Sequence, residues 1–430
     1  MELIIYTLRS ISSAIVEPPL MFILAVLTIL FYFKNKKTES MQKIIIGGKG
    51  ESALELTLSQ FVFGIIGGTV GSLILSGLGV KFSYESGIQY LFFISIILMF
   101  FKPKYICFSY SAGILGTAVI LVEMLSGVFP EILDRNTFKI DIVYLLLFVG
   151  VFHVVEGILV MLDGHRGGIP VFTESENKII GGYAFKRYWI IPISMIFMTE
   201  ALRINNSIDM SVNIPYWWPL VNGTGLTLSG IIVMMPFYAI IGYSSVTFTK
   251  NKRKKSFISG LNILTYGICV IIISQVAQFG IIGRIFAVIF LPVAHEFMLK
   301  IQNKSEEKNE LIFVSDDEGL VVLDISRDSQ MLQYGLEIGD KVLSVNGNSI
   351  ISEREIYEIL KKNLYRVNMM IRKKNGEIKE FIHVHDKTKR LGILLVPRKV
   401  IKGKVTEVKD SSFKNILEEI KRVKDSPKNS

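Results

Sequence analysis

Cysteine is nearly absent from this 430-residue chain, which contains only Cys107 and Cys269. Both lie in long apolar runs, so the sequence contains neither a disulfide framework nor the paired cysteines typical of a zinc site. The N-terminus also lacks a basic segment followed by a small-residue cleavage site, and we expect no removable signal peptide. No metal, other cofactor or disulfide is therefore predicted from the sequence.

Apolar residues are abundant instead. They make up half of the chain, phenylalanine alone contributes 28 residues, and the mean hydropathy is +0.44. The apolar runs are confined to residues 1–299, whereas residues 300–430 are charged and alternate in polarity. This division predicts a multi-spanning membrane domain over 1–299, a charged linker over 300–310 and a soluble C-terminal part.

The membrane domain is expected to contain about eight to nine transmembrane helices, because a helix needs roughly 20 apolar residues to cross a bilayer. The first segment, 3–16, contains Arg9 and several serines and is interpreted as a helix lying at the membrane surface. The nine apolar runs lie at 19–33, 59–80, 87–101, 105–126, 141–162, 187–202, 225–248, 256–276 and 280–299.

Lysine and arginine are unequally distributed between the two sides of this predicted domain. With the C-terminus inside, the inner segments hold sixteen of them and the outer segments five. The positive-inside rule then predicts a multi-pass protein of the cell membrane whose C-terminal part lies in the cytoplasm. The net charge of +10 is explained by this asymmetry and by contact with anionic lipid, so no nucleic-acid partner is expected. The inner residues are Lys34, Lys36, Lys37, Lys43, Lys49, Lys102, Lys104, Arg166, Lys178, Lys186, Arg187, Lys250, Lys252, Arg253, Lys254 and Lys255, and the outer ones are Arg9, Lys81, Arg135, Lys139 and Arg203.

Residues 328–347 have the pattern of a PDZ domain. A strand predicted at 319–325 leads into a short helix, Gly335 suits the left-handed position that ends this helix, and Asn346-Gly347 is a strong turn pair. The pattern predicts a small α+β PDZ domain over 311–400, followed by a charged amphipathic tail over 401–430. Its further elements are strands at 311–315, 341–345, 367–371, 378–384 and 390–396, and a helix that begins with the capping box at Ser352.

The last predicted strand carries the candidate binding site. PDZ domains bind a peptide as an added strand beside one sheet edge, and a Gly-hydrophobic loop donates backbone N–H groups to its terminal carboxylate. The segment 391–394 has this form, and its place at the end of the domain resembles the circularly permuted PDZ domains common in bacteria. It is interpreted either as a working groove or as a strand that only closes the core. The predicted peptide-binding residues are Leu391, Gly392, Ile393, Leu394, Leu395, Ile356 and Leu360.

Several ionisable residues fall within the apolar runs, where hydrocarbon disfavours them unless they are paired or hydrated. His153 and Glu156 lie one helical turn apart, Asp163 follows in a Leu-Asp-Gly sequence, and His295 precedes Glu296 near the end of the last run. These groups either form hydrogen-bonded pairs between helices or belong to a functional site.

A His-Glu pair, a Leu-Asp-Gly sequence and a PDZ domain together resemble the site-2 family of intramembrane zinc proteases. That family requires His-Glu-x-x-His on one helix, with both imidazoles on one metal ion. Leu299 occupies the position of the second histidine here, and the Leu-Asp-Gly sequence precedes the His-Glu pair instead of following it. We therefore expect no enzyme. A site-2-type or degenerate relative, and a transporter-like protein regulated by its PDZ domain, remain the alternatives.

Small residues four apart, at 64–71 and 113–116, predict close helix approach. The approach is either within one chain or between the copies of a homo-oligomer.

The whole plan resembles the MinJ-like family of division-site proteins from Gram-positive rod-shaped bacteria. The resemblance rests on the polytopic N-terminal part, the segments 153–157, 162–164 and 292–296 within it, and one C-terminal PDZ module. It implies a membrane-anchored adaptor that recruits protein partners, bridging a DivIVA-like scaffold to a MinD-like ATPase in septum placement. Gln330-Met331 replace the Pro-Ala common in bacterial PDZ helices, which affects packing and not the groove.

Overall fold

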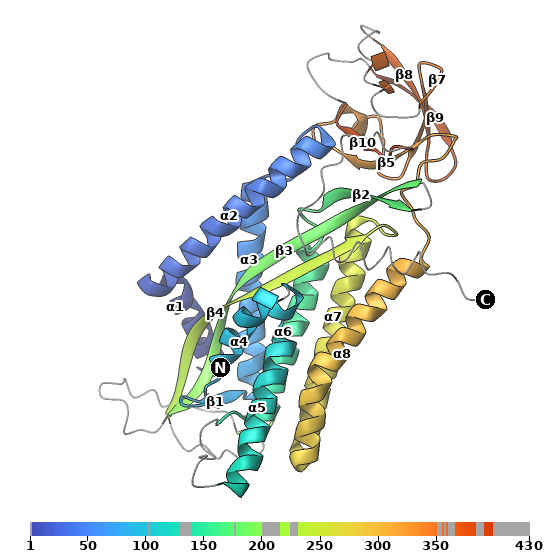
Figure 1. Ribbon diagram of the computed structural model, residues 1–430. Coiled ribbons are helices and arrows are strands. Elements are labelled where there is room, and N and C mark those ends of the chain that lie inside the picture. The colour runs from blue at the N-terminus through green and yellow to red at the C-terminus, as the bar shows by residue number, and fades with distance from the viewer. Residues whose placement is uncertain are drawn as a thin grey trace, which may run out of the picture.

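The computed structural model describes residues 2–101, 103–129, 139–175, 178–199, 216–223, 231–350, 355–356, 358–359, 366–383 and 391–398. An elongated part built from helices and one long β-hairpin carries a small β-rich domain at one end (Figure 1). We call residues 2–308 the membrane part and residues 311–398 the C-terminal domain.

Six helices among the described residues are long and apolar enough to cross a bilayer. The most enclosed is α6, with 72% of its most apolar window buried, whereas α2 exposes large apolar side chains such as Phe22 and Phe33. Burial in the centre and apolar exposure at the periphery are what a bilayer requires, and the chain is a membrane protein. The six are α2 (Pro18–Ile46), α3 (Ala53–Leu78), α5 (Phe108–Val128), α6 (Ile142–Asp163), α7 (Lys252–Ser274, continued by η3, Gln275–Gln278) and α8 (Gly280–Lys308).

Two of the predicted spans are strands. β3 (Lys178–Thr199) and β4 (Ile231–Thr247) form an antiparallel hairpin that pairs from Tyr183 opposite Thr247 to Thr199 opposite Ile231. The helices expected at 187–202 and 225–248 are therefore wrong for every residue described there. A strand buried on both faces reads as a continuous apolar run, which a hydropathy window does not distinguish from a helix.

The remaining elements of the membrane part are short. α4 (Tyr90–Phe101) has 12 residues, too few to cross a bilayer alone, and η1 (Pro103–Ile106) joins it to α5. α1 (Glu2–Val16) is helical as expected and packs its buried face on α3 and β4. β1 (Lys81–Ser83) and β2 (Ile169–Ser175) pair with β3.

Glycines bring α3 against its neighbours within the chain. A Cβ atom at Gly64 or Gly68 would lie about 2 Å from the backbone oxygen of Ile190 or Pro192 in β3. The second small-residue segment is used in the same way, since Gly113 and Gly116 face α8. Close approach within the chain, one of the two predicted readings, is thus observed.

The polar segment expected to be a linker continues the last helix, because α8 runs to Lys308. Glu306 holds it in place: its carboxylate binds Lys250 Nζ at 3.0 Å and Lys255 Nζ at 2.9 Å, and accepts hydrogen bonds from Thr247 and Thr249. The segment predicted as a charged linker is therefore helical as far as Lys308 and is held to the start of α7 by buried ion pairs.

The C-terminal domain is a twisted antiparallel sheet with the strand order β10-β5-β6-β8-β9. Gly335 and the Asn346-Gly347 pair have positive φ angles, as the turn chemistry predicted. The strand expected at 311–315 makes only one isolated bridge, from Val314 to Ile180 of the membrane part. The described elements are β5 (Leu320–Ile325), η4 (Gln330–Leu332), β6 (Lys341–Val345), β7 (Asn348–Ser349), β8 (Val367–Arg372), β9 (Ile378–His383) and β10 (Ile393–Leu395).

Candidate functional site

The predicted binding strand, β10, lies at the edge of the sheet. It pairs antiparallel with β5 on one side, with Ile393 opposite Ile325, and no described strand pairs with its other side. An unpaired edge is the geometry that strand addition requires.

Side chains alternate along β10 between two hydrophobic clusters. Leu391, Ile393 and Leu395 belong to the core of the C-terminal domain, together with the fully buried Ile356. Leu394 belongs to the core of the membrane part instead. Leu394 therefore contacts the membrane part, and its predicted role in peptide binding stays a prediction. Leu360, the last of the seven predicted residues, lies outside the described residues.

Gly392 is placed where only glycine fits without strain. Its φ angle is +65°, and a Cβ atom there would lie 2.9 Å from the Cβ of Ser326. Its carbonyl accepts a hydrogen bond of 2.7 Å from Ser326 N, and the Leu391 carbonyl accepts one of 2.6 Å from Ser329 Oγ. The loop before β10 is therefore fixed by the η4 side of the domain.

The face of β5 and β10 that points away from the core of the C-terminal domain packs on the membrane part. Val396 and Leu323 both lie against Gly181 of β3, and Gly181 N donates to the Phe313 carbonyl at 2.9 Å. Lys252 Nζ, at the start of α7, reaches Asp324 Oδ2 at 2.6 Å. These apolar contacts and this ion pair fix the orientation of the sheet relative to the membrane part.

A second set of contacts joins the domain to the turn between α2 and α3. Lys49 N donates to Asp328 Oδ1 at 2.9 Å, and the Lys49 carbonyl accepts from Arg327 N at 3.0 Å. Arg327 also pairs with Glu55 at 2.7 Å. The hydrogen bonds from Ser326 Oγ and Lys49 N hold the pKa of Asp328 below its usual range.

Basic residues collect where the two parts meet. They line a cavity of about 620 Å³ between the start of α7 and the C-terminal domain. Burial there lowers the pKa of the His165 imidazole. The lysines and the arginine that line the cavity are Lys250, Lys252, Arg253, Lys254 and Lys374.

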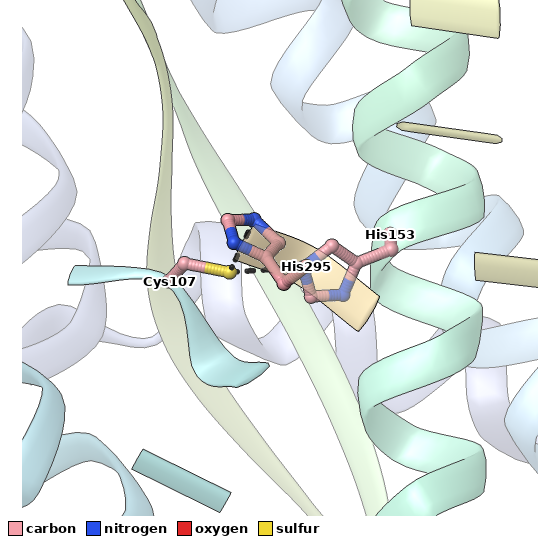
Figure 2. Close-up of side chains that lie close together, drawn as sticks. All are labelled: Cys107, His153 and His295. Atoms are coloured by element: carbon pink, nitrogen blue, oxygen red, sulfur yellow. Dashed lines mark hydrogen bonds between the residues drawn. The ribbon is translucent and has the colours of Figure 1, made fainter. Parts of the chain in front are cut away.

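Within the membrane part, the two conspicuous histidines come together. His153, midway along α6, and His295, on α8, approach each other with ring centroids 5.9 Å apart. The Sγ atom of Cys107, which precedes α5, contacts both rings, at 3.0 Å from His153 Nε2 and 3.5 Å from His295 Nε2 (Figure 2). Sequence reasoning did not connect Cys107 with either histidine, because only the fold brings these positions together.

Glu156 and Glu296 have different neighbours. Glu156 Oε2 lies 4.0 Å from His153 Nε2 on the same helix, which is too far for a hydrogen bond. Glu296 accepts a hydrogen bond of 2.7 Å from the Tyr110 hydroxyl. Leu299, which takes the place of a second zinc-binding histidine on α8, is packed against the hydrophobic core.

Asp163 of the Leu-Asp-Gly sequence is fully buried. Its Oδ2 accepts hydrogen bonds from the Arg187 guanidinium and, at 2.9 Å, from Trp189 Nε1. The Arg187 guanidinium also donates to Ser59 Oγ at 2.7 Å. This group joins α6, α3 and β3, so its arrangement is structural.

Comparison with known proteins gives one informative match. No family model matches the chain, and no solved structure matches it. The chain is 24% identical over 331 residues to the cell division topological determinant MinJ of Bacillus subtilis strain 168, covering 74% of this chain and 77% of that protein. The predicted resemblance to MinJ is thereby confirmed over about three quarters of both chains.

Proposed function

We propose that this protein is a membrane-anchored adaptor that recruits protein partners to the division site through a PDZ-like C-terminal domain. The observation that carries the proposal is the β10 edge, which is unpaired among the described strands and is preceded by Gly392 at a positive φ. A bound peptide would add as the next strand, with its terminal carboxylate at the backbone of the Gly392 loop.

The two-sided burial of β10 supports this arrangement. Leu394 and Val396 hold the strand on the membrane part, while Ile393 and Leu395 line the domain interior beside Ile356. These three side chains are at most 2% exposed, so we propose that they position the edge strand from inside the domain. Because the opposite face is anchored, the edge is held rigidly, which lowers the entropy cost of ordering it on binding.

We propose that the C-terminal domain lies on the cytoplasmic side of the membrane. The α2–α3 turn and the start of α7 carry many of the basic residues that the positive-inside rule assigns to the inner side, and both contact the C-terminal domain. Their charge also favours contact with anionic lipid of the inner leaflet.

The partners follow from the resemblance. The relative is named as a cell division topological determinant. On the resemblance noted in the sequence, we propose a DivIVA-like scaffold and a MinD-like ATPase as binding partners. Division-site placement is accordingly the biological role that we propose. The chain itself is proposed to perform no catalysis, and the resemblance leaves open whether it acts as a homo-oligomer.

Affinity capture tests the groove. The full-length protein and two variants, Gly392→Glu and Gly376→Glu, would be captured from solubilised membranes. Both glycines have positive φ angles. Gly376 lies in the β8–β9 turn, and a Cβ atom there would meet nothing within 4 Å, so Gly376→Glu is the control for backbone strain alone. We expect Gly392→Glu alone to lose partners, since it combines strain, a clash with Ser326 and repulsion of a bound carboxylate.

Limited proteolysis of the C-terminal domain would show that both variants are folded. Recovery of the same partners by folded Gly392→Glu would overturn the groove as the binding site. Binding would then have to run through the membrane part or through residues 401–430.

A further inference from the structure

Three potential metal ligands from three different helices meet inside the membrane part. Cys107, His153 and His295 each offer one ligand atom, and these atoms all lie within 4.8 Å of one another. The residues come from the start of α5, the middle of α6 and α8, and Cys107 lies 188 positions from His295 (Figure 2). A thiolate and two imidazoles are a donor set that suits zinc.

Hydrogen bonds to the other ring nitrogens orient both imidazoles. His153 Nδ1 lies 2.7 Å from the Val149 carbonyl, which only accepts, so Nδ1 carries the proton and Nε2 has a free lone pair. The Tyr110 hydroxyl donates its proton to Glu296, so its oxygen accepts one from His295 Nδ1 at 3.1 Å. On both histidines, the unprotonated nitrogen with its lone pair is therefore Nε2, the atom that faces Cys107. Such supporting partners are typical of metal-binding histidines.

The sulfur atom is placed for the same purpose. Cys107 is the N-cap residue of α5, and its side chain makes no capping hydrogen bond. The positive end of a helix dipole stabilises a thiolate. A tetrahedral zinc ion with a Zn–S bond of about 2.3 Å and Zn–N bonds of about 2.0–2.1 Å holds sulfur and nitrogen about 3.5 Å apart. The observed distance to His295 is 3.5 Å, and that to His153 is 3.0 Å.

Glu156 lies beside this group and can balance its charge, but it does not belong to the three residues whose ligand atoms all lie within 4.8 Å of one another. Its Oε2 lies 4.0 Å from His153 Nε2, one helical turn along α6. A thiolate and a carboxylate together would neutralise a divalent ion, which matters because uncompensated charge is costly inside a membrane.

Hydrogen bonds alone are the competing arrangement. Ser109 Oγ lies 3.1 Å from His153 Nε2, so the serine hydroxyl and the Cys107 thiol could each donate to one imidazole. This arrangement explains the contacts without an ion, and it is the outcome against which the inference is tested.

We propose that the full-length protein binds one Zn²⁺ through Cys107 Sγ, His153 Nε2 and His295 Nε2, with Glu156 close enough to balance its charge. The ion would join α5, α6 and α8 at the centre of the membrane part. This inference is independent of the adaptor function and departs from the expectation of a metal-free protein.

Metal analysis of the purified full-length protein tests the proposal. After zinc loading and removal of free metal, mass spectrometry should find about one zinc per chain in the parent. Cys107→Ser and His295→Ala should lose most of it. Cys269→Ser is the matched control, because Cys269 is the other free cysteine and belongs to no described group of metal ligands, so it should keep the parent's zinc content.

Cobalt substitution gives a readout that needs no variant. Co²⁺ bound at this site should show the ligand-field absorption of four-coordinate cobalt together with a thiolate-to-cobalt charge-transfer band. A parent protein with negligible zinc after loading and no thiolate band would overturn the proposal and leave the hydrogen-bonded cluster. Equal zinc in the parent and in folded Cys107→Ser would overturn it as well, because the ion would then lie elsewhere.

Discussion

The Asp163 carboxylate of α6 binds the Arg187 guanidinium of β3 in the interior, where both side chains are almost completely inaccessible to solvent. This ion pair fastens the long β-hairpin to the most buried helix of the membrane part. It gives the Leu-Asp-Gly sequence a structural role at the end of the molecule that carries the C-terminal domain.

Removal of this carboxylate should destabilise the membrane part strongly. Asp163→Ala leaves the Arg187 charge buried and unpaired, which typically costs about 3–5 kcal/mol. Thermal unfolding in detergent should show a large drop in Tm. Glu85→Ala is the control, since its ion pair with Lys139 is exposed and worth less than about 1 kcal/mol. Similar Tm changes for the two variants would contradict this role of Asp163.

The approach of α3 to β3 should tolerate no side chain at Gly68. A Cβ there would lie 2.1 Å from the Pro192 oxygen, so Gly68→Ala must push the two elements apart and lower the Tm. Gly77 lies in the same helix with nothing within 4 Å of its Cβ position. Gly77→Ala should raise stability slightly, by up to about 1 kcal/mol, because alanine favours a helix over glycine. Equal effects of both changes would show that α3 does not approach β3 this closely.

Docking of the C-terminal domain should weaken in acid. Asp328 has a pKa lowered from the ordinary value of 3.8 by its bonds to Ser326 and Lys49. A carboxyl group whose folded pKa is depressed contributes stability above its unfolded pKa, and this contribution is lost as the pH falls through the folded pKa. The Tm difference between the parent and Asp328→Asn should therefore be present at pH 7 and shrink below about pH 4. A difference that is constant with pH would refute the role of this carboxylate.

Membrane orientation is open to a reporter test. A reporter active only in the cytoplasm should work when fused after Ser430 or inserted near Lys252, and should fail when inserted near Asn213. The reason is the excess of lysine and arginine in the segments on the side of the C-terminal domain. Activity of an export-dependent reporter at Ser430 would reverse the proposed topology.

The sequence by itself determined the division of the chain and much of the local structure. Six of the predicted apolar runs are long helices. They could be predicted because a run of about 20 apolar residues is enough to cross a bilayer as a helix. Gly335 and Asn346-Gly347 adopt positive φ angles because turn chemistry is local. The strands β5, β6, β8 and β9 follow from alternation and turn residues in the same way.

Only the tertiary structure decided the remainder. β3 and β4 are apolar enough for helices, although each contains a proline, Pro192 or Pro236, which disfavours a helix interior. Their pairing with each other and their burial under α3 and α1 select the strand. The side of the sheet that Leu394 faces depends on where β3 lies. The meeting of Cys107 with His153 and His295 depends on how three helices pack. Contacts between residues 46 to 188 positions apart leave no periodic pattern in a sequence, so the fold alone reveals them.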